Sequence, residues 1–381
     1  MNKKFVASIF LSLVFTSGNQ CSFAAEPKLS GGFIQFIDAN LPKPDHVALP
    51  FAWEDVVTDM SDLKMSKIVI QRMKVKNNDA AGSQSEFYFI DPVTKIPYNN
   101  DPLKIILQKA QEKNMDVFVG LYSDESINGN NARLMNAANQ PEFHRLLDAQ
   151  ADNDLAVAKT LWESYSANSA FKGWYLPIEP WNFQWQEWKN AEFNLYLRKV
   201  STGLALLKKD QGSGMRRLPV MWAPHFKVAY LNATDTGSLY KRLLDGTKID
   251  IIAVQDGFGA EPRRSNHEIS DYFSAFKSAC ETLVSDVNVS GKAELWSDAE
   301  LYSAPGVPAT IEKLKKQLCA VKNLVTTIIC WDFFHYMTDK VPNTPANWAF
   351  PMVASPLNSR KVLHDDYKQS FVNETFTCPD R

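Results

Sequence analysis

Two short segments of the chain each end an apolar run in a glutamate. The first is Gly173-Trp-Tyr-Leu-Pro-Ile-Glu179, and the second is Leu295-Trp-Ser-Asp-Ala-Glu300. Short apolar runs of this kind are typical of buried strands in a parallel sheet. A carboxylate at the carboxyl end of such a strand lies where α/β barrels assemble their active sites. Two facing carboxylates could hydrolyse a glycosidic bond, because one protonates the leaving oxygen while the other attacks the anomeric carbon or activates water.

The residues around Glu179 favour the acid role for this side chain. Ile178, Pro180 and Trp181 are apolar neighbours, which would raise the pKa of Glu179. We therefore predict that Glu179 is the general acid and Glu300 the nucleophile of a retaining mechanism, with inverting chemistry left open. The alternative for Glu179 is a packing role, in which it pairs with an arginine at the rim of the barrel.

The segment that ends at Glu300 carries a second acid on the same face. Side chains alternate along a strand, so Trp296, Asp298 and Glu300 share one face. Glu294 begins that strand and is expected at the end opposite to the site. Asp298 is therefore a rival to Glu300, and Asp256, at the end of the preceding strand, is a rival to either glutamate.

Further polar and aromatic residues stand at or near the ends of the other predicted strands. Amides, carboxylates, an imidazole and aromatic planes together make a lining suited to a polyhydroxylated ligand. The predicted substrate-binding residues are Gln35, Gln71, Tyr122, Trp181, Asn182, Trp222, His225, Gln255, Asp256, Trp296, Asp298 and Trp331. For any single glutamine, the alternative is a hydrogen bond to a loop backbone.

Metal-dependent and acyl-enzyme chemistry lack their sequence patterns. The first predicted strand ends Gln35-Phe36-Ile37, without the His-x-His of metal-dependent hydrolase barrels. The six histidines are scattered without ligand spacing. A Gly-x-Ser-x-Gly nucleophile motif is absent as well. We predict a site that needs neither a metal nor a cofactor.

These side chains must be carried by a repeating frame of strands and helices. The candidate strands are Gly32–Ile37, Lys67–Met73, Met115–Tyr122, Gly173–Glu179, Leu218–Pro224, Asp250–Gln255, Ala293–Ser297 and Leu324–Asp332. The clearest helical patterns between and after them are Pro102–Lys113, Trp185–Lys209, His267–Leu283, Ile311–Lys322 and Asn358–Gln369. Because parallel strands need crossover connections, this alternation predicts an α/β fold. Eight strands favour a closed (β/α)8 TIM barrel.

A doubly wound open sheet fits the sequence less well than the barrel. That fold would place a Gly-rich phosphate turn after its first strand, whereas Gly31-Gly32 precedes the strand here. Long polar loops are expected after strands two and three, at Asn77–Asn100 and Ser123–Gln140. Loops of this length are usually functional or mobile. We expect one TIM-barrel domain over residues 25–381, since no repeat or low-complexity linker divides it.

The N-terminus has the pattern of a secretory signal peptide. Lys3 and Lys4 precede a short apolar block, and a small-x-small cleavage pattern follows at 22–25. We expect residues 1–24 to be removed and the protein to be exported to the periplasm or outside the cell. The apolar block is too short to span a bilayer, so we expect no membrane insertion.

Charge and cysteine content restrict the class of partner. Lys and Arg number 41 against 43 Asp and Glu, and no basic stripe appears, which argues against nucleic acid. A carbohydrate is the expected partner, and the oligomeric state is left open. The four cysteines after the signal peptide form no Cys-x-x-Cys pair. Export permits disulfides among them, and Cys280 and Cys319 fall on consecutive predicted helices.

Six segments together resemble a family of exported bacterial TIM barrels of unassigned function. They are Gly32-Phe-Ile-Gln35, Ile68-Val-Ile-Gln71, Trp174-Tyr-Leu-Pro-Ile-Glu179, Val220-Met-Trp-Ala-Pro224, Gln255-Asp-Gly-Phe-Gly259 and Leu295-Trp-Ser-Asp-Ala-Glu300. They occur in order over nearly the whole mature chain. The wider resemblance is to retaining glycosidases that carry an acid/base glutamate after strand four and a nucleophile glutamate after strand seven.

This wider resemblance implies Glu179 as acid/base and Glu300 as nucleophile, with one departure from the pattern. Those enzymes usually have an asparagine just before the acid/base, where it holds the 2-hydroxyl of the sugar, whereas Ile178 stands here. Either Asn182, Gln255 or Asp256 takes that task, or the substrate and mechanism differ.

The leading hypothesis is a secreted glycoside hydrolase that acts on a poly- or oligosaccharide. A non-catalytic carbohydrate-binding barrel is the first alternative, in which the acids hydrogen-bond sugar hydroxyls without cleaving them. A secreted interaction protein, which binds another protein through its long loops, is the second.

Overall fold

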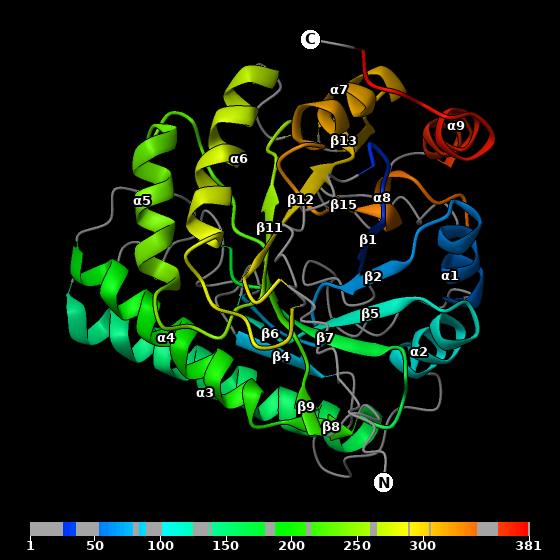
Figure 1. Cartoon of the computed structure of the whole chain (residues 1–381). Helices are drawn as coiled ribbons and strands as arrows, with labels where there is room; N and C mark the ends of the chain where they lie inside the picture. Colours follow the sequence, from blue (N-terminus) through cyan, green and yellow to red (C-terminus); the bar gives the residue numbers. More distant parts are fainter. Residues whose placement is uncertain are drawn as a thin grey trace, which may run out of the picture.

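A closed barrel of eight parallel strands forms the centre of the molecule, and helices surround it (Figure 1). The computed structural model describes residues 26–35, 53–78, 84–88, 101–124, 137, 139–179, 187–210, 215–259, 265–288, 290–304, 306–340 and 357–379. The barrel strands are β1 (Gly31–Ile34), β2 (Lys67–Ile70), β5 (Asp116–Gly120), β7 (Phe171–Leu176), β10 (Val220–Trp222), β11 (Ile251–Gln255), β12 (Glu294–Glu300) and β15 (Thr327–Trp331). The predicted (β/α)8 TIM barrel is confirmed, with all eight strands in the expected order.

Alternation along the strands separates the barrel interior from the layer beneath the helices. Interior positions carry one apolar cluster, which includes Phe33, Val69, Phe118, Tyr175 and Trp296. The intervening positions belong to a much larger cluster that packs against the helices. Gly173 leaves room for the ring of Phe118, because a Cβ at this position would lie 2.2 Å from the ring. The interior is therefore a packed core up to the ends of the strands.

Helices cover the outside of the barrel, and several of them begin at polar caps. They are α1 (Trp53–Asp62), α2 (Pro102–Glu112), α3 (Gln140–Tyr165), α4 (Glu187–Ala205), α5 (Ala233–Leu244), α6 (Asn266–Cys280), α7 (Ile311–Val321), α8 (Phe333–Tyr336) and α9 (Leu357–Tyr367), followed by a π-helical segment, Lys368–Asn373. Asp101, Asn139 and Thr310 cap α2, α3 and α7, and Ser265 forms a capping box with Glu268 at α6. All five predicted helices are confirmed, with shifted ends.

Three short sheets lie outside the barrel in the described part of the chain. In one, β3 (Lys74–Asn78) pairs antiparallel with β4 (Gln84–Tyr88) and parallel with β6 (Tyr122–Asp124). The inserts expected at Asn77–Asn100 and Ser123–Gln140 thus meet in one small sheet, and their remaining parts lie largely outside the described residues. In another, β8 (Lys208–Asp210) pairs with β9 (Met215–Arg217), which is why α4 ends before the predicted Lys209. A third pair, β13 (Tyr302–Ala304) and β14 (Val307–Pro308), follows β12.

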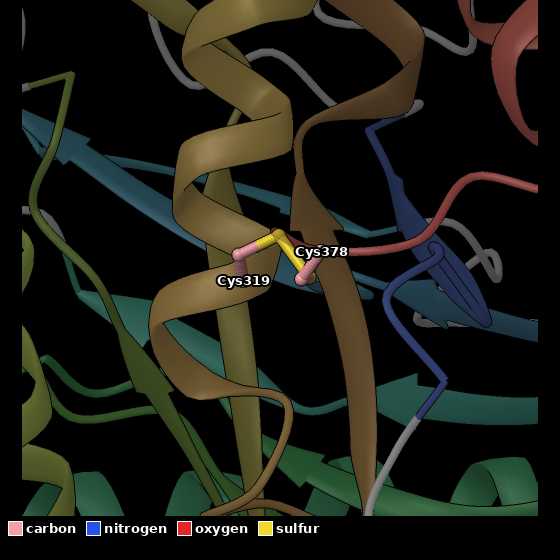
Figure 2. The surroundings of a disulfide bond; sticks show 2 residues. All are labelled: Cys319 and Cys378. Carbon is pink, nitrogen blue, oxygen red and sulfur yellow. A yellow bond between two sulfur atoms is a disulfide. The ribbon is translucent and has the colours of Figure 1, made fainter. Parts of the chain in front are cut away.

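The C-terminal segment is fixed to the barrel by one disulfide and by buried polar contacts. Cys319 on α7 is bonded to Cys378, with their Cα atoms 5.6 Å apart (Figure 2). Cys280 pairs with neither and is buried as a free thiol. His364 on α9 lies 2.8 Å from Asp59 on α1, and the Tyr367 hydroxyl accepts the Leu29 N–H at 2.9 Å. None of the helices in the described ranges combines the length and apolarity needed to cross a membrane.

Candidate active site

Glu300 ends β12 on the interior face and is held by hydrogen-bond donors. The Gly259 N–H donates to Glu300 Oε2 at 2.5 Å, and the Tyr302 hydroxyl also hydrogen-bonds this carboxylate. Gly259 is required here, because a Cβ would lie 2.5 Å from the Tyr302 ring. The Glu300 side chain is buried, at 2% exposure. The Gln-Asp-Gly-Phe-Gly segment singled out in the sequence therefore supplies a donor to the predicted nucleophile.

Asp256 braces the backbone around Glu300 and is not available to a substrate. Its Oδ1 accepts the Phe258 N–H at 3.0 Å and the Glu300 N–H at 3.3 Å. Its Oδ2 accepts from Gln317 Nε2 at 2.8 Å. Burial, and then the nearby Glu300 carboxylate, raise the pKa of Asp256 to about 7. The prediction that Asp256 contacts substrate is corrected, because both of its oxygens bond to the protein.

Helix α7 provides two contacts that the sequence analysis missed. Gln317 bridges Asp256 and the Glu300 carbonyl, which accepts from Nε2 at 3.1 Å. Lys313 donates to the carbonyls of Phe258 and Tyr302, each at 2.9 Å. One signal was present, since Gln317 adjoins Leu318 on the apolar stripe that α7 turns toward the barrel. A polar residue within such a stripe indicates a buried hydrogen-bond partner.

Glu179 follows β7 by three residues and is only partly buried. The preceding carbonyl, that of Ile178, accepts the Trp222 Nε1–H at 2.8 Å, which fixes the chain where it leaves the strand. Glu179 and Glu300 are both close enough to Asp298 to raise its pKa, after burial as the largest cause. The structure thus places the two predicted catalytic glutamates near the same buried acid, one after β7 and one at the end of β12, with β10 and β11 between these strands in the barrel.

Asp298 occupies the interior face of β12, one alternation below Glu300. It is fully buried, and neither carboxylate oxygen has a hydrogen-bond partner in the described part of the chain. Burial is the largest cause that raises its pKa well above the usual range, followed by the charges of Asp256 and Glu300. Burial therefore favours the protonated form of Asp298, which does not suit it to the nucleophile role.

Several other predicted residues lie at the strand ends as expected. Gln35 and Gln71 are buried directly after β1 and β2. Gln255 ends β11 and donates to the Ala223 carbonyl at 3.3 Å. Trp331 ends β15, is partly exposed, and meets the Phe33 ring edge-on at 5.0 Å. Its exposure suits a platform on which a sugar ring could stack.

Two polar residues that contact one another, Asp332 and His335, follow the last barrel strand. The peptide bond between Trp331 and Asp332 is cis. Asp332 accepts the backbone N–H of His335 at 2.6 Å and lies 2.6 Å from its ring nitrogen Nδ1.

The predicted residue His225, after β10, is buried, and its carbonyl accepts from the Tyr240 hydroxyl at 3.1 Å.

Two of the predicted tryptophan platforms are corrected by the structure. Trp222 points away from the barrel interior and packs against the rings of Phe193 and Tyr240. Trp296 does face the interior but lies near the start of β12, where its Nε1 donates to Glu294 at 2.9 Å. Both rings are almost completely buried and lie away from the interior ends of the strands, so they pack the core.

Tyr122 is corrected for a similar reason. It begins β6, outside the barrel sheet, and its ring is buried in the outer core. Its N–H and carbonyl are bonded to Asp154 and Gln150 of α3. Trp181 and Asn182 lie outside the described residues.

Among the residues that the structure describes, no group of three or more His, Cys, Asp or Glu side chains could hold a metal ion.

The fold and the site define a class: a (β/α)8 barrel with acidic side chains gathered at the carboxyl ends of its strands. Residues 29–346 match the family described as a domain of unknown function, DUF4434, and the chain belongs to this family. The resemblance to a family of unassigned function is thereby confirmed. No curated protein sequence matches the chain.

Solved structures with the same fold include glycoside hydrolases. One is a putative α-L-fucosidase from Bacteroides thetaiotaomicron VPI-5482, with a TM-score of 0.63 and 17% identity over 91% of this chain and 96% of that chain. Another is an endo-1,4-β-D-mannanase from Thermotoga petrophila RKU-1, with a TM-score of 0.55 and 10% identity over 90% and 98% of the two chains. At these identities the similarity establishes the fold, and function must be argued from the site.

Proposed function

We propose that this protein is a glycoside hydrolase that cleaves a poly- or oligosaccharide with Glu179 as general acid/base and Glu300 as nucleophile. The observation that carries the proposal is that both side chains lie near Asp298, with Glu179 following β7 and Glu300 ending β12. A barrel shared with glycoside hydrolases along nearly its whole length supports the same class of chemistry.

The surroundings of the two glutamates support different roles. Glu300 accepts hydrogen bonds from Gly259 and Tyr302, and such donors favour the ionised form that a nucleophile needs. Glu179 is partly exposed beyond the end of its strand, where an acid can reach the leaving oxygen and later exchange its proton with water. Trp331 offers an apolar face for the sugar ring at the same end of the barrel.

Two single substitutions test this assignment. Glu300→Gln removes the nucleophile, so kcat for a polysaccharide that the parent protein cleaves should fall by at least ~10⁴-fold. Glu179→Gln removes the acid, so kcat should fall by ~10²–10⁴-fold. The loss in Glu179→Gln should be much smaller for a 2,4-dinitrophenyl glycoside, whose leaving group needs no protonation. Glu294→Gln is the matched control, because Glu294 begins the same strand and bonds to Trp296.

The stereochemical outcome is tested separately. A retaining mechanism gives a first product with the anomeric configuration of the substrate, which proton NMR detects. In a crystal structure, it also requires carboxyl groups about 5–5.5 Å apart, against roughly 6.5–9.5 Å for inversion. If both glutamine variants bind a polysaccharide that neither they nor the parent cleaves, the barrel is a carbohydrate-binding protein instead.

Export is part of the proposal. The Lys3-Lys4 segment and the apolar block after it have the pattern of a signal peptide. The Cys319–Cys378 disulfide supports an oxidising compartment, where such bonds persist.

A further inference from the structure

Polar side chains on the interior face near the two glutamates retain unused hydrogen-bonding atoms. Gln35 and Gln71 each follow an interior residue by two positions, after Phe33 and Val69, so they face the barrel interior. They are 4% and 7% exposed. Within the described residues, Gln35 Nε2 and Gln71 Oε1 make no hydrogen bond. One atom is a donor and the other an acceptor, as a ligand hydroxyl requires.

Asp298 and Tyr175 add two more such groups from β12 and β7. Neither oxygen of Asp298 nor the Tyr175 hydroxyl has a partner among the described atoms, and both side chains are 0% exposed. They are near one another, because the Asp298 charge contributes to the raised pKa of Tyr175, after burial and the charge of Glu179. Tyr175 belongs to the interior cluster, and Asp298 lies two residues before Glu300 on the same face of β12.

Buried polar atoms without partners destabilise a fold, and most native proteins satisfy them. Asp256 shows that this barrel can do so, because it is equally buried on the adjacent strand end and accepts three hydrogen bonds. Asp298 accepts none. A side chain that weakens the free protein is retained when it binds something else.

We propose that Gln35, Gln71, Tyr175 and Asp298 form the floor of a subsite that binds the hydroxyl groups of a neutral sugar ring. This inference rests on the proposed function and adds the class of substrate. The groups that face Asp298 from the packed strands are Asp256, Glu300, Glu179 and Asp332, with Tyr175 and Cys330 as further neighbours. Arg72 is a cation near Tyr175, but the carboxylates around Asp298 outnumber it, so a uronate placed there should bind less tightly than a neutral sugar.

The stability of the free protein tests the proposed subsite in the absence of any substrate. Asp298→Leu replaces an unpartnered acid by an apolar side chain of the same shape, so the melting temperature should stay equal or rise by ~2–4 °C. Asp256→Leu is the matched control and should melt lower, since it breaks three hydrogen bonds. A fall for Asp298→Leu as large as that of Asp256→Leu would mean that Asp298 supports the fold, and would overturn the proposal.

Binding gives the second test, in a Glu300→Gln background that cannot turn substrate over. The probes are matched oligosaccharide pairs: β-1,4-glucan and its C6-oxidised glucuronan, β-1,4-mannan and mannuronan, and galactan and galacturonan. Calorimetry should give at least ~10-fold tighter binding of the neutral member of a pair, a difference of about 1.4 kcal/mol. Asp298→Leu should remove that binding, and Asp298→Asn, which keeps a donor and an acceptor, should retain it.

The two results separate this inference from the proposed function. Tighter binding of the uronate member would overturn the neutral-sugar floor while leaving Glu179 and Glu300 as the catalytic pair. Conversely, unchanged turnover in Glu300→Gln would reject Glu300 as the nucleophile, whereas the melting temperatures would still report whether Asp298 is a binding group.

Discussion

At the scale of single residues, the position of the Glu300 carboxylate depends on close contacts from two other segments of the chain. The Gly259 N–H donor and the Tyr302 hydroxyl both reach its carboxylate, and the Tyr302 ring stacks on Tyr336 at 5.2 Å. The ring therefore has little freedom to move away from Gly259. An enzyme loses activity when the groups that position its catalytic carboxylate, here the Gly259 N–H and the Tyr302 hydroxyl, move by a fraction of an ångström.

Gly259→Ala should lower kcat by about 10- to 100-fold with a small effect on folding. The added Cβ would lie 2.5 Å from the Tyr302 ring, so the donor or the ring must shift, and both touch Glu300. Steady-state kinetics measure the effect. Gly203→Ala is the control, because its Cβ also meets an atom at 2.5 Å, but that atom belongs to the flexible Leu155 side chain on α3. Equal kcat in the two variants would contradict this role for Gly259.

The sequence predicted which residues belong to the site better than it predicted which residues contact them. Alternation placed Glu300 and Asp298 on the interior face of β12, as found. The same rule, applied to β10, would have turned Trp222 outward, because Met221 and Ala223 face the interior. The bond from Gln317 to Asp256 joins residues 61 positions apart, and no local pattern predicts such a partner.

At the scale of elements, α3 is fixed to the barrel by a buried acid. Asp154 accepts the Tyr122 N–H at 3.1 Å and the Tyr196 hydroxyl at 2.8 Å, and so joins α3 to β6 and α4. Gln150 and Asp154 interrupt the apolar stripe of α3 with polar residues. This interruption explains why the helix was less evident from the sequence than α2 or α7, whose stripes are largely apolar.

Burial raises the pKa of Asp154 to about 7, which makes the α3 anchor sensitive to pH. An unfolded chain loses this proton near pH 4 and the folded protein near pH 7, so the folded state binds more protons in between. This group therefore lowers stability as pH rises from 4 to 7. Asp154→Asn removes the titration, so its stability relative to the parent should increase between pH 5 and pH 8.

Denaturant titrations at several pH values measure this difference. Asp148→Asn is the control on the same helix, because Lys199 lowers the pKa of Asp148 and its titration is complete below pH 5. The difference between that variant and the parent should be flat over the same range. A flat difference for Asp154→Asn as well would show that Asp154 does not titrate as proposed.

At the scale of the whole molecule, the barrel was predictable because its signal repeats. Each βα unit contributes an apolar run and an amphipathic helix, so eight weak local signals support one closed arrangement. The attachment of the C-terminal segment to the barrel is not part of this repeat. Cys378 follows α9 and meets Cys319 across 59 residues, and sequence spacing alone could not select this pair among four cysteines (Figure 2).

The disulfide should contribute to global stability through the unfolded chain. Linking residues 59 positions apart restricts the unfolded state, with a gain of about 4 kcal/mol in the chain-entropy model. The Cys319→Ser/Cys378→Ser double variant should therefore unfold at a lower denaturant concentration than the parent. Dithiothreitol should lower the midpoint of the parent to that of the variant and leave the variant unchanged. Equal midpoints without reductant would show that the C-terminal segment separates before the barrel unfolds, so that the bond secures the segment but not the barrel.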